Sequence, residues 1–556
     1  MRMIDWKNLA LLGALALLLS TSAAAQNRAN VSIDLGKPVN ILTGTSLGVP
    51  ALTFESSSFN PDGAIYLRSA GVSVARYPGN HGVADLYHWS TKTTTRYKGA
   101  EAGYFAPEST FPSFALFAEK LGQAVIVVNY GANLDATGGG EPAEAAAWVA
   151  YANGDPANTH DLGKDSTGED WHTVGYWAQL RAQAPLATED GLNFLRIQHP
   201  RPFGFKLWQI GDQVYNNGYY GGDHVGNPDL RGAAPTALKD YSKLKGDPKL
   251  SPSAYAENLK AFAKAMKAVD PGIRIGAAIT TPPDPSLRTK TYWDKDGEHP
   301  DPSAWAAVTW GIDFNKQLLT GACPSLDFVT LEWTLGPLLP PDWKTLDEPS
   351  LLTTTKSSFS NIVNSMIASY GQYCPQGHFP KLTFAPAALS PWIKVEHPVV
   401  KALWLADTYA MLIESGSENI DWSEMYGDSM LSADRKKFGP AFYGFQMLHI
   451  VAHTPGDALL DATSTSSMVG AHATHRRDGY FGVMLVNKDN KNEAVVKITL
   501  KNGSIGATGK RFDYGSAQFD AGTPLAVTPF SATGNEFTIT LAPYSITDIL
   551  LPDHNQ

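Results

Sequence analysis

Eight short apolar runs recur along the chain as far as residue 422, and segments of helical periodicity lie between most of them. Each run has the length of a strand and is enriched in apolar and β-branched residues, as in strands that are buried on both faces. Eight such runs alternating with helices predict an α/β fold, a closed parallel (β/α)8 TIM barrel with its functional residues at the carboxyl ends of the strands. The runs are residues 39–42, 72–77, 124–130, 205–210, 273–279, 326–333, 381–385 and 419–422.

The expected helices carry ordinary start and stop signals. Residues 142–153 begin with Pro and are followed by Gly154, and residues 254–269 end before Asp270 and Pro271. Residues 357–370 and 399–413 also have apolar side chains at helical spacing. These four segments are expected to cover the outside of the barrel.

Beyond about residue 455 the pattern changes to short strands separated by Gly, Asn and Asp. Residues 479–487, 494–500, 525–529, 536–541 and 544–551 predict a C-terminal antiparallel β-sandwich. Residues 30–35 alternate like an isolated strand and are expected to join that sandwich. We therefore divide the chain into a leader (1–25), a strand of the sandwich (26–38), the barrel (39–452) and the sandwich domain (453–556).

The first 25 residues have the layout of a secretory signal peptide. Arg2 and Lys7 precede an apolar stretch over residues 9–19, and three alanines at 23–25 offer a cleavage site. No later stretch is apolar over the roughly 18 residues that a membrane span needs. We expect a secreted or periplasmic protein without a membrane span.

Cys323 and Cys374 are the two cysteines of the chain. Each stands a few residues before an expected barrel strand, so both would lie at the same end of the sheet if those strands are neighbours. A disulfide between them, permitted by export, would contribute on the order of 4 kcal/mol in the chain-entropy model. The alternative is a pair of buried free thiols, and both interpretations are structural.

Composition and motifs exclude several function classes. The formal net charge of −10 provides no basic footprint for nucleic acid. We find no phosphate-binding loop, no Gly-x-Ser-x-Gly nucleophile motif and no recognisable spacing of metal ligands. We expect no cofactor and no metal, and the pattern favours no particular oligomeric state.

Three fragments at successive strand ends have a characteristic order and spacing. The chain reads Val-Ala-Arg-Tyr-Pro-Gly over 74–79, Val-Val-Asn-Tyr-Gly over 127–131, and Leu-Trp-Gln-Ile-Gly-Asp-Gln over 207–213. With Tyr-His-Trp at 87–89 and the helix that starts near Glu144, these fragments resemble the α-L-arabinofuranosidase-like glycoside hydrolases of clan A. The resemblance extends from about residue 40 to 450 and implies a barrel with a sugar-binding cleft, and hence an oligo- or polysaccharide partner.

The resemblance also implies a mechanism that this chain departs from at two positions. That family hydrolyses with retention, using one Glu at the end of strand four and a second at the end of strand seven. Gln213 stands at the first position, and Ala385 or Pro386 at the second. An amide does not act as a general acid or base, and neither Ala nor Pro can attack an anomeric carbon.

Carboxylates occur at other strand ends, which leaves two hypotheses. A relocated catalytic pair drawn from Glu332, Asp212 and Glu424, with Asp421 beside the last, would make the chain an exported glycoside hydrolase. The same groups could instead bind sugar hydroxyls in a catalytically inactive glycan-binding pseudoenzyme. Candidate substrate-binding residues in either case are Arg76, Trp89, Asn129, Trp208, Gln213, Tyr215, Trp333 and Trp422.

Overall fold

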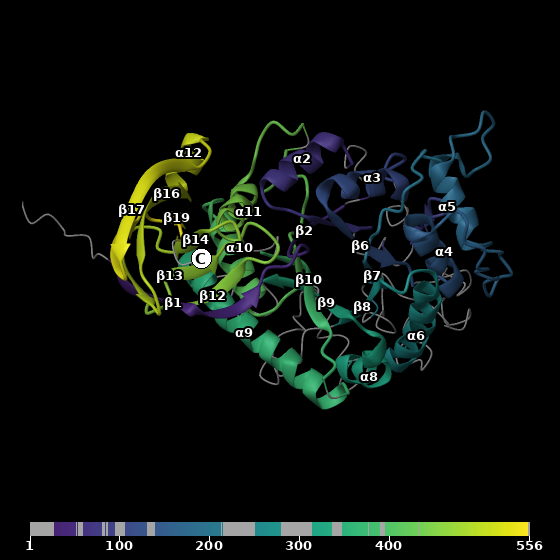
Figure 1. Ribbon diagram of the computed structural model, residues 1–556, viewed down its shortest axis with the longest axis horizontal. Coiled ribbons are helices and arrows are strands. Elements are labelled where there is room, and N and C mark those ends of the chain that lie inside the picture. Colours follow the sequence, from purple (N-terminus) through teal and green to yellow (C-terminus); the bar gives the residue numbers. More distant parts are fainter. Residues whose placement is uncertain are drawn as a thin grey trace, which may run out of the picture.

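The computed structural model describes most of the chain between residues 27 and 553 (Figure 1). The residues outside the description are 1–26, 52, 54–58, 80–83, 85–86, 95–105, 131–139, 213, 215–250, 280–313, 336–346, 376, 390–394, 433 and 554–556. The expected signal peptide, Gln213 and Tyr215 lie among them.

Eight parallel strands close into a barrel, as the apolar runs predicted. In barrel order these strands are β2 (Leu47–Pro50), β3 (Val74–Tyr77), β6 (Gln123–Val128), β7 (Leu207–Ile210), β8 (Arg274–Ile279), β9 (Phe328–Leu335), β10 (Lys381–Leu389) and β11 (Asn419–Asp421). All eight are near-continuously buried where their side chains are described, because helices cover the outside and side chains fill the inside.

The first barrel strand is not the one that the sequence predicted. Residues 39–41 belong to β1 (Asn27–Ile41), which lies in the other sheet, and Val39 and Ile41 are largely exposed there. The barrel starts instead with the fully buried Leu-Gly-Val-Pro of β2. A four-residue strand that contains Gly and Pro has little strand propensity, so its pattern was not distinctive.

Helices surround the barrel, and their starts follow ordinary capping chemistry. Thr110, Ser251 and Asp347 each accept a hydrogen bond from a backbone N–H of the first turn. The helices are α2 (Pro61–Ser69), α3 (Phe111–Leu121), α4 (Pro142–Asn153), α5 (Val174–Ala182), α6 (Pro252–Val269), α8 (Phe314–Ala322), α9 (Glu348–Tyr373), α10 (Val400–Glu414) and α11 (Pro440–Val451), with short η2 (Asn193–Leu195) and η8 (Cys323–Ser325). None of the described helices is long and apolar enough to span a membrane.

Nine further strands form one sheet beside α10 and α11 (Figure 1). Its order is β17 (Ala526–Gly534), β16 (Ile505–Gly515), β19 (Ser545–Pro552), β14 (Tyr480–Asn487), β13 (Val469–His475), β12 (Ala458–Ser464), β1, β15 (Ala494–Lys501) and β18 (Glu536–Leu541). Strands from both ends of this order contribute to one apolar core, so the two layers of the expected sandwich are two arms of one curved sheet. A small hairpin of β4 (Tyr87–His88) and β5 (Thr93–Thr94) and the short helix α12 (Ser516–Ala521) complete the described elements.

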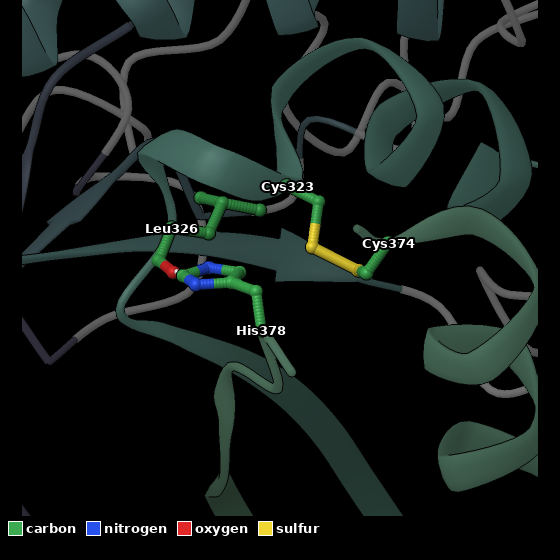
Figure 2. Close-up of a disulfide and its surroundings, with 4 residues drawn as sticks. All are labelled: Cys323, Leu326, Cys374 and His378. Carbon is green, nitrogen blue, oxygen red and sulfur yellow. Dashed lines mark hydrogen bonds between the residues drawn. A yellow bond between two sulfur atoms is a disulfide. The ribbon is translucent and has the colours of Figure 1, made fainter. Parts of the chain in front are cut away.

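Cys323 and Cys374 form a disulfide across 51 residues, with Cα atoms 5.6 Å apart (Figure 2). Of the two alternatives for these cysteines, the bridge is the one present. It joins η8, which precedes β9, to the residue that follows α9 and leads to β10. Close by, His378 Nε2 lies 2.8 Å from the Leu326 carbonyl oxygen.

A buried charge network ties the barrel to the nine-stranded sheet. His472 on β13 lies between two carboxylates of α10, with Nδ1 2.8 Å from Glu414 Oε1 and Nε2 3.1 Å from Asp407 Oδ1. Lys488 Nζ lies 2.6 Å from the other oxygen of Asp407. Burial opposes the charge on His472, but the two carboxylates outweigh it and raise the pKa of His472 to about 9.

The His472→Gln variant is expected to lose about 3 kcal/mol of unfolding free energy at pH 6, because it removes the cationic partner of Glu414 and leaves Asp407 with Lys488 alone. The pKa of His472 is raised on folding, so its contribution is complete below about 6.5 and is lost as the pH rises through about 9. Urea unfolding at pH 6 and pH 10 measures this difference. The exposed His172→Gln variant is the control, and an equal loss at both pH values would contradict the account.

Asp548 on β19 is a buried carboxyl group that, unlike those around His472, has no cationic partner among the described residues. It shares the barrel-facing side of the strand with Ile546, whereas Ile549 and Leu551 face the core of the sheet. Neither of its carboxylate oxygens accepts a hydrogen bond from the described residues. Burial raises the pKa of Asp548 well above its ordinary value, and the charge of Asp513 acts in the same direction.

The Asp548→Asn variant is expected to be more stable than wild type at pH 9, by about 1–3 kcal/mol, the range of cost for a buried polar group without a partner. A raised carboxyl pKa makes wild-type stability fall as the pH rises, and the amide removes that fall. Thermal unfolding between pH 4 and pH 9 measures the effect, with the exposed Asp520→Asn as control. If the difference in stability between wild type and variant stays constant over this pH range, the raised pKa assigned to Asp548 is wrong.

Candidate functional site

A small pocket opens at the carboxyl ends of four barrel strands, the end where barrel enzymes hold their functional residues. Pro50 ends β2, Arg76 comes from β3, Ala385 and Pro386 come from β10, and Asp421 ends β11. The lining is completed by Gly79, Trp422 and Ser423. Closure of the barrel brings these residues together although they span more than 370 positions of the chain.

A buried ion pair crosses this end of the barrel. Arg76 Nη2 donates a hydrogen bond to Asp212 Oδ1, and both side chains are almost inaccessible to solvent. Asp212 follows β7, which is separated from β3 by β6. The guanidinium cannot lose its proton, so it stabilises the ionised form of Asp212.

Asp421 lies near the same guanidinium but in a different state. Its side chain is buried, and neither of its oxygens accepts a hydrogen bond of normal geometry from the described residues. Burial raises the pKa of Asp421 to about 7, although the charge of Arg76 and the nearby Asn419 amide both oppose the rise. That amide is committed elsewhere, because Asn419 Nδ2 donates to the Thr45 carbonyl at 2.8 Å.

Gly48 on the neighbouring strand allows Asp421 its position. A Cβ atom at residue 48 would lie 1.8 Å from Asp421 Oδ1 and 2.9 Å from Asn419 Nδ2. Strand β2 therefore needs glycine at this point for steric reasons. Asp421 stands close to Glu424 in the sequence but was not among the predicted catalytic residues.

The tip of β10 carries no ionisable group. Its sequence Lys-Leu-Thr-Phe-Ala-Pro-Ala-Ala-Leu has a cis peptide between Ala385 and Pro386, and the pairing with β9 is irregular between Phe384 and Ala387. The Ala387 carbonyl accepts a hydrogen bond from the Tyr409 hydroxyl at 2.8 Å. Ala385 and Pro386 thus face the pocket where the resemblance implies a nucleophile.

Two expected sugar platforms are core residues instead. Trp89 and Trp208 have no exposed surface. Trp89 stacks on Trp148 with ring centroids 5.8 Å apart, and Trp208 Nε1 donates to the Phe205 carbonyl at 3.0 Å. We correct both assignments, because a ring enclosed by other side chains cannot stack on a sugar.

The other expected residues have mixed placements. Trp422 is mostly buried but lines the pocket, as Arg76 does. Glu424 is held within its own loop, where Oε1 accepts hydrogen bonds from the Ser429 hydroxyl and backbone N–H, so it is not among the groups that line the pocket. The backbone of Glu332 and Trp333 lies in β9, but their side chains are outside the description.

Asn129 belongs to a second polar cluster beside the barrel mouth. It follows β6, and its Nδ2 lies 3.3 Å from Glu144 Oε2, on the first turn of α4. His88 Nδ1 lies 3.0 and 3.1 Å from the two oxygens of the same carboxylate. Glu144 is buried, so Asn129 is engaged in a structural hydrogen-bond network with a residue that the sequence did not predict as part of a site.

The described residues contain no group of three or more His, Cys, Asp and Glu side chains that could hold a metal ion. The charged or titratable side chains that line the pocket are those of Arg76 and Asp421, and Asp212 is linked to this lining through its ion pair with Arg76. One carboxyl is stabilised as an anion by Arg76, and the other can carry a proton near neutral pH.

Comparison with known proteins gives a likeness of fold. No protein-family model and no curated protein matches the sequence. An α-L-arabinofuranosidase from Thermotoga maritima, solved with arabinose, superposes with a TM-score of 0.60 at 16% identity, covering 94% of this chain and 100% of that one. A family 51 arabinofuranosidase from Xanthomonas axonopodis pv. citri gives 0.61 at 14% identity, over 94% and 99% of the two chains.

More distant hydrolases superpose over the same extent. A family 44 xyloglucanase from Paenibacillus polymyxa, solved with xyloglucan, gives a TM-score of 0.55 at 12% identity, covering 95% of this chain and 100% of that one. These likenesses include the barrel and the nine-stranded sheet together. The chain therefore has the fold of the arabinofuranosidases and related glycoside hydrolases.

Proposed function

We propose that the protein hydrolyses glycosidic bonds of an oligo- or polysaccharide outside the cytoplasm, with Asp421 as proton donor and Asp212 as the anionic partner. The observation that carries this proposal is the contrast between two carboxyl groups that both lie near Arg76: one is bound to the guanidinium and the other is buried with its pKa near 7. In hydrolases, environments that favour the ionised form of one carboxyl group and the protonated form of another give the two groups base and acid roles. The disulfide fits an oxidising compartment.

The reaction follows from these roles. Asp421 donates its proton to the glycosidic oxygen as the bond to the anomeric carbon breaks. A water molecule forms the new bond at that carbon, and Asp212 accepts the proton that the water releases. Exchange with solvent then returns Asp421 to the protonated and Asp212 to the ionised form. No covalent sugar intermediate is needed, which suits a β10 tip without a nucleophile.

Asp421→Asn is expected to lower kcat at least 100-fold, the usual lower bound for removing a general acid. The wild-type kcat is expected to fall as the pH rises through about 7, because the donor loses its proton there. Reducing-sugar release from arabinans, xylans and bacterial glycans between pH 5 and pH 9 measures both effects. Asp428→Asn, an exposed aspartate of the same loop, is the matched control.

Full activity in Asp421→Asn would contradict the role of Asp421. If activity instead disappears in Glu332→Gln with Asp421 intact, catalysis depends on Glu332 and the pair proposed here is wrong.

A second candidate function is glycan binding without hydrolysis. The observation in its favour is that Asp212 is already committed to a buried ion pair while β10 offers no nucleophile. A binder is expected to bind a glycan from the same panel, by calorimetry, with no product after prolonged incubation. The proposal of hydrolysis predicts product from the bound glycan in wild type and no product in Asp212→Asn, assayed at a temperature at which circular dichroism shows that the variant is folded.

A further inference from the structure

A second pocket opens at the opposite end of the barrel strands. It has a volume of about 870 Å³, including space open to solvent, and lies beside the end of α11, so we call it the α11 pocket. Leu47, the first residue of β2, lines the α11 pocket, whereas Pro50, the last, lines the pocket near Asp421. Three strand steps of about 3.3 Å put about 10 Å between these two residues, so the pockets are distinct.

The polar side chains of the α11 pocket are donors and hydroxyls. Arg68 from the last turn of α2 supplies a permanent positive charge, and His449 and His453 come from the end of α11 and the segment after it. Four hydroxyl-bearing residues also line it: Thr43, Ser46, Ser73 and Thr454. None of the described lining residues is acidic.

Asp457, two positions after the last lining residue, directs both of its carboxylate oxygens to neighbouring donors. Asp457 Oδ2 accepts the backbone N–H groups of His453 and Thr454 at 2.8 and 2.9 Å. Its Oδ1 accepts hydrogen bonds from the Thr454 hydroxyl at 3.0 Å and from the backbone N–H of Arg477 at 2.9 Å. Both oxygens of this carboxylate are therefore occupied by donors, and the lining itself presents a guanidinium, two imidazoles and hydroxyl groups.

Tight packing holds the two imidazoles at the pocket. Their ring centroids are 4.5 Å apart. Gly71 has a φ of +87°, and a Cβ atom there would lie 2.5 Å from His449 Cβ, so glycine permits the close approach of α11. Burial lowers the pKa of His449 to about 4; His453 and Arg476 act in the same direction and Asp457 opposes them. His449 is therefore neutral at pH 7, and its imidazole can donate one hydrogen bond.

We infer that the α11 pocket binds a small oxyanion, a sulfate, phosphate or carboxylate group, through Arg68, His453 and the neighbouring hydroxyls. Charge-assisted hydrogen bonds from a guanidinium are the strongest means a protein has of holding such groups. The apolar part of the lining, which includes Leu42, Val72 and Leu121, can contact the carbon skeleton that carries the anion. The group can belong to a free inorganic ion or to an acidic sugar.

The test titrates the full-length protein with sodium sulfate at constant ionic strength, balanced with sodium chloride. Calorimetry is expected to give a Kd of about 1 mM or tighter. NMR of protein with labelled histidine is expected to show shifts confined to His449 and His453, with the pKa of His449 raised by the bound anion. Arg68→Gln should weaken binding at least tenfold, and His453→Gln should weaken it without loss of thermal stability.

Lys120→Gln is the matched control. Lys120 lies beside Arg68, whose Nη1 donates to the Lys120 carbonyl at 3.2 Å, but Lys120 does not line the pocket. Competition with glucuronate and with neutral xylose distinguishes an acidic sugar from a free inorganic ion. If glucuronate displaces sulfate and xylose does not, the site binds acidic sugars. If neither sugar displaces sulfate, the site binds inorganic anions. Either result supports the site. Sulfate that leaves the two histidines unshifted, or that binds equally well to Arg68→Gln, overturns it.

Discussion

The buried charge of Arg76 is the constraint on which the candidate site depends. A guanidinium keeps its proton at any relevant pH, so a fold that encloses it must supply a carboxylate. Asp212 meets that need from the end of β7. Asp421 is then a second carboxyl near a charge that is already neutralised, and burial outweighs what attraction remains. One cation and two acids thus leave one acid ionised and one able to hold a proton.

The surrounding fold keeps these three groups in place. Closure of the barrel sets β3, β7 and β11 around one mouth, and Gly48 leaves room for the Asp421 carboxylate. Outside the barrel, the His472 network connects α10 to the sheet that follows it in the chain. Helix α10 leads directly into β11, which ends at Asp421, so the network also steadies the element that carries the proposed proton donor.

The large-scale fold could be predicted from periodicity, because long apolar runs record burial on both faces of a strand. The first barrel strand was missed because a four-residue strand that contains Gly and Pro shows almost no apolar pattern. The site was harder. Spacing places Trp89 and Trp208 near strand ends but cannot say which way a ring points, and both rings point into the core. The raised pKa of Asp421 depends on burial, which outweighs the opposing charge of Arg76, 345 positions away in the chain, and no local sequence pattern reports either effect.

The central claim is that Asp421 holds its proton to near neutral pH while Asp212 remains ionised. The most direct test is the carboxyl carbon NMR spectrum of protein with labelled aspartate, recorded from pH 3 to pH 9 for wild type and Asp421→Asn. The account predicts one wild-type resonance that titrates near pH 7 and is missing from the variant. If the resonance that the variant lacks titrates instead near the ordinary aspartate value of about 4, the proposed division of roles is wrong.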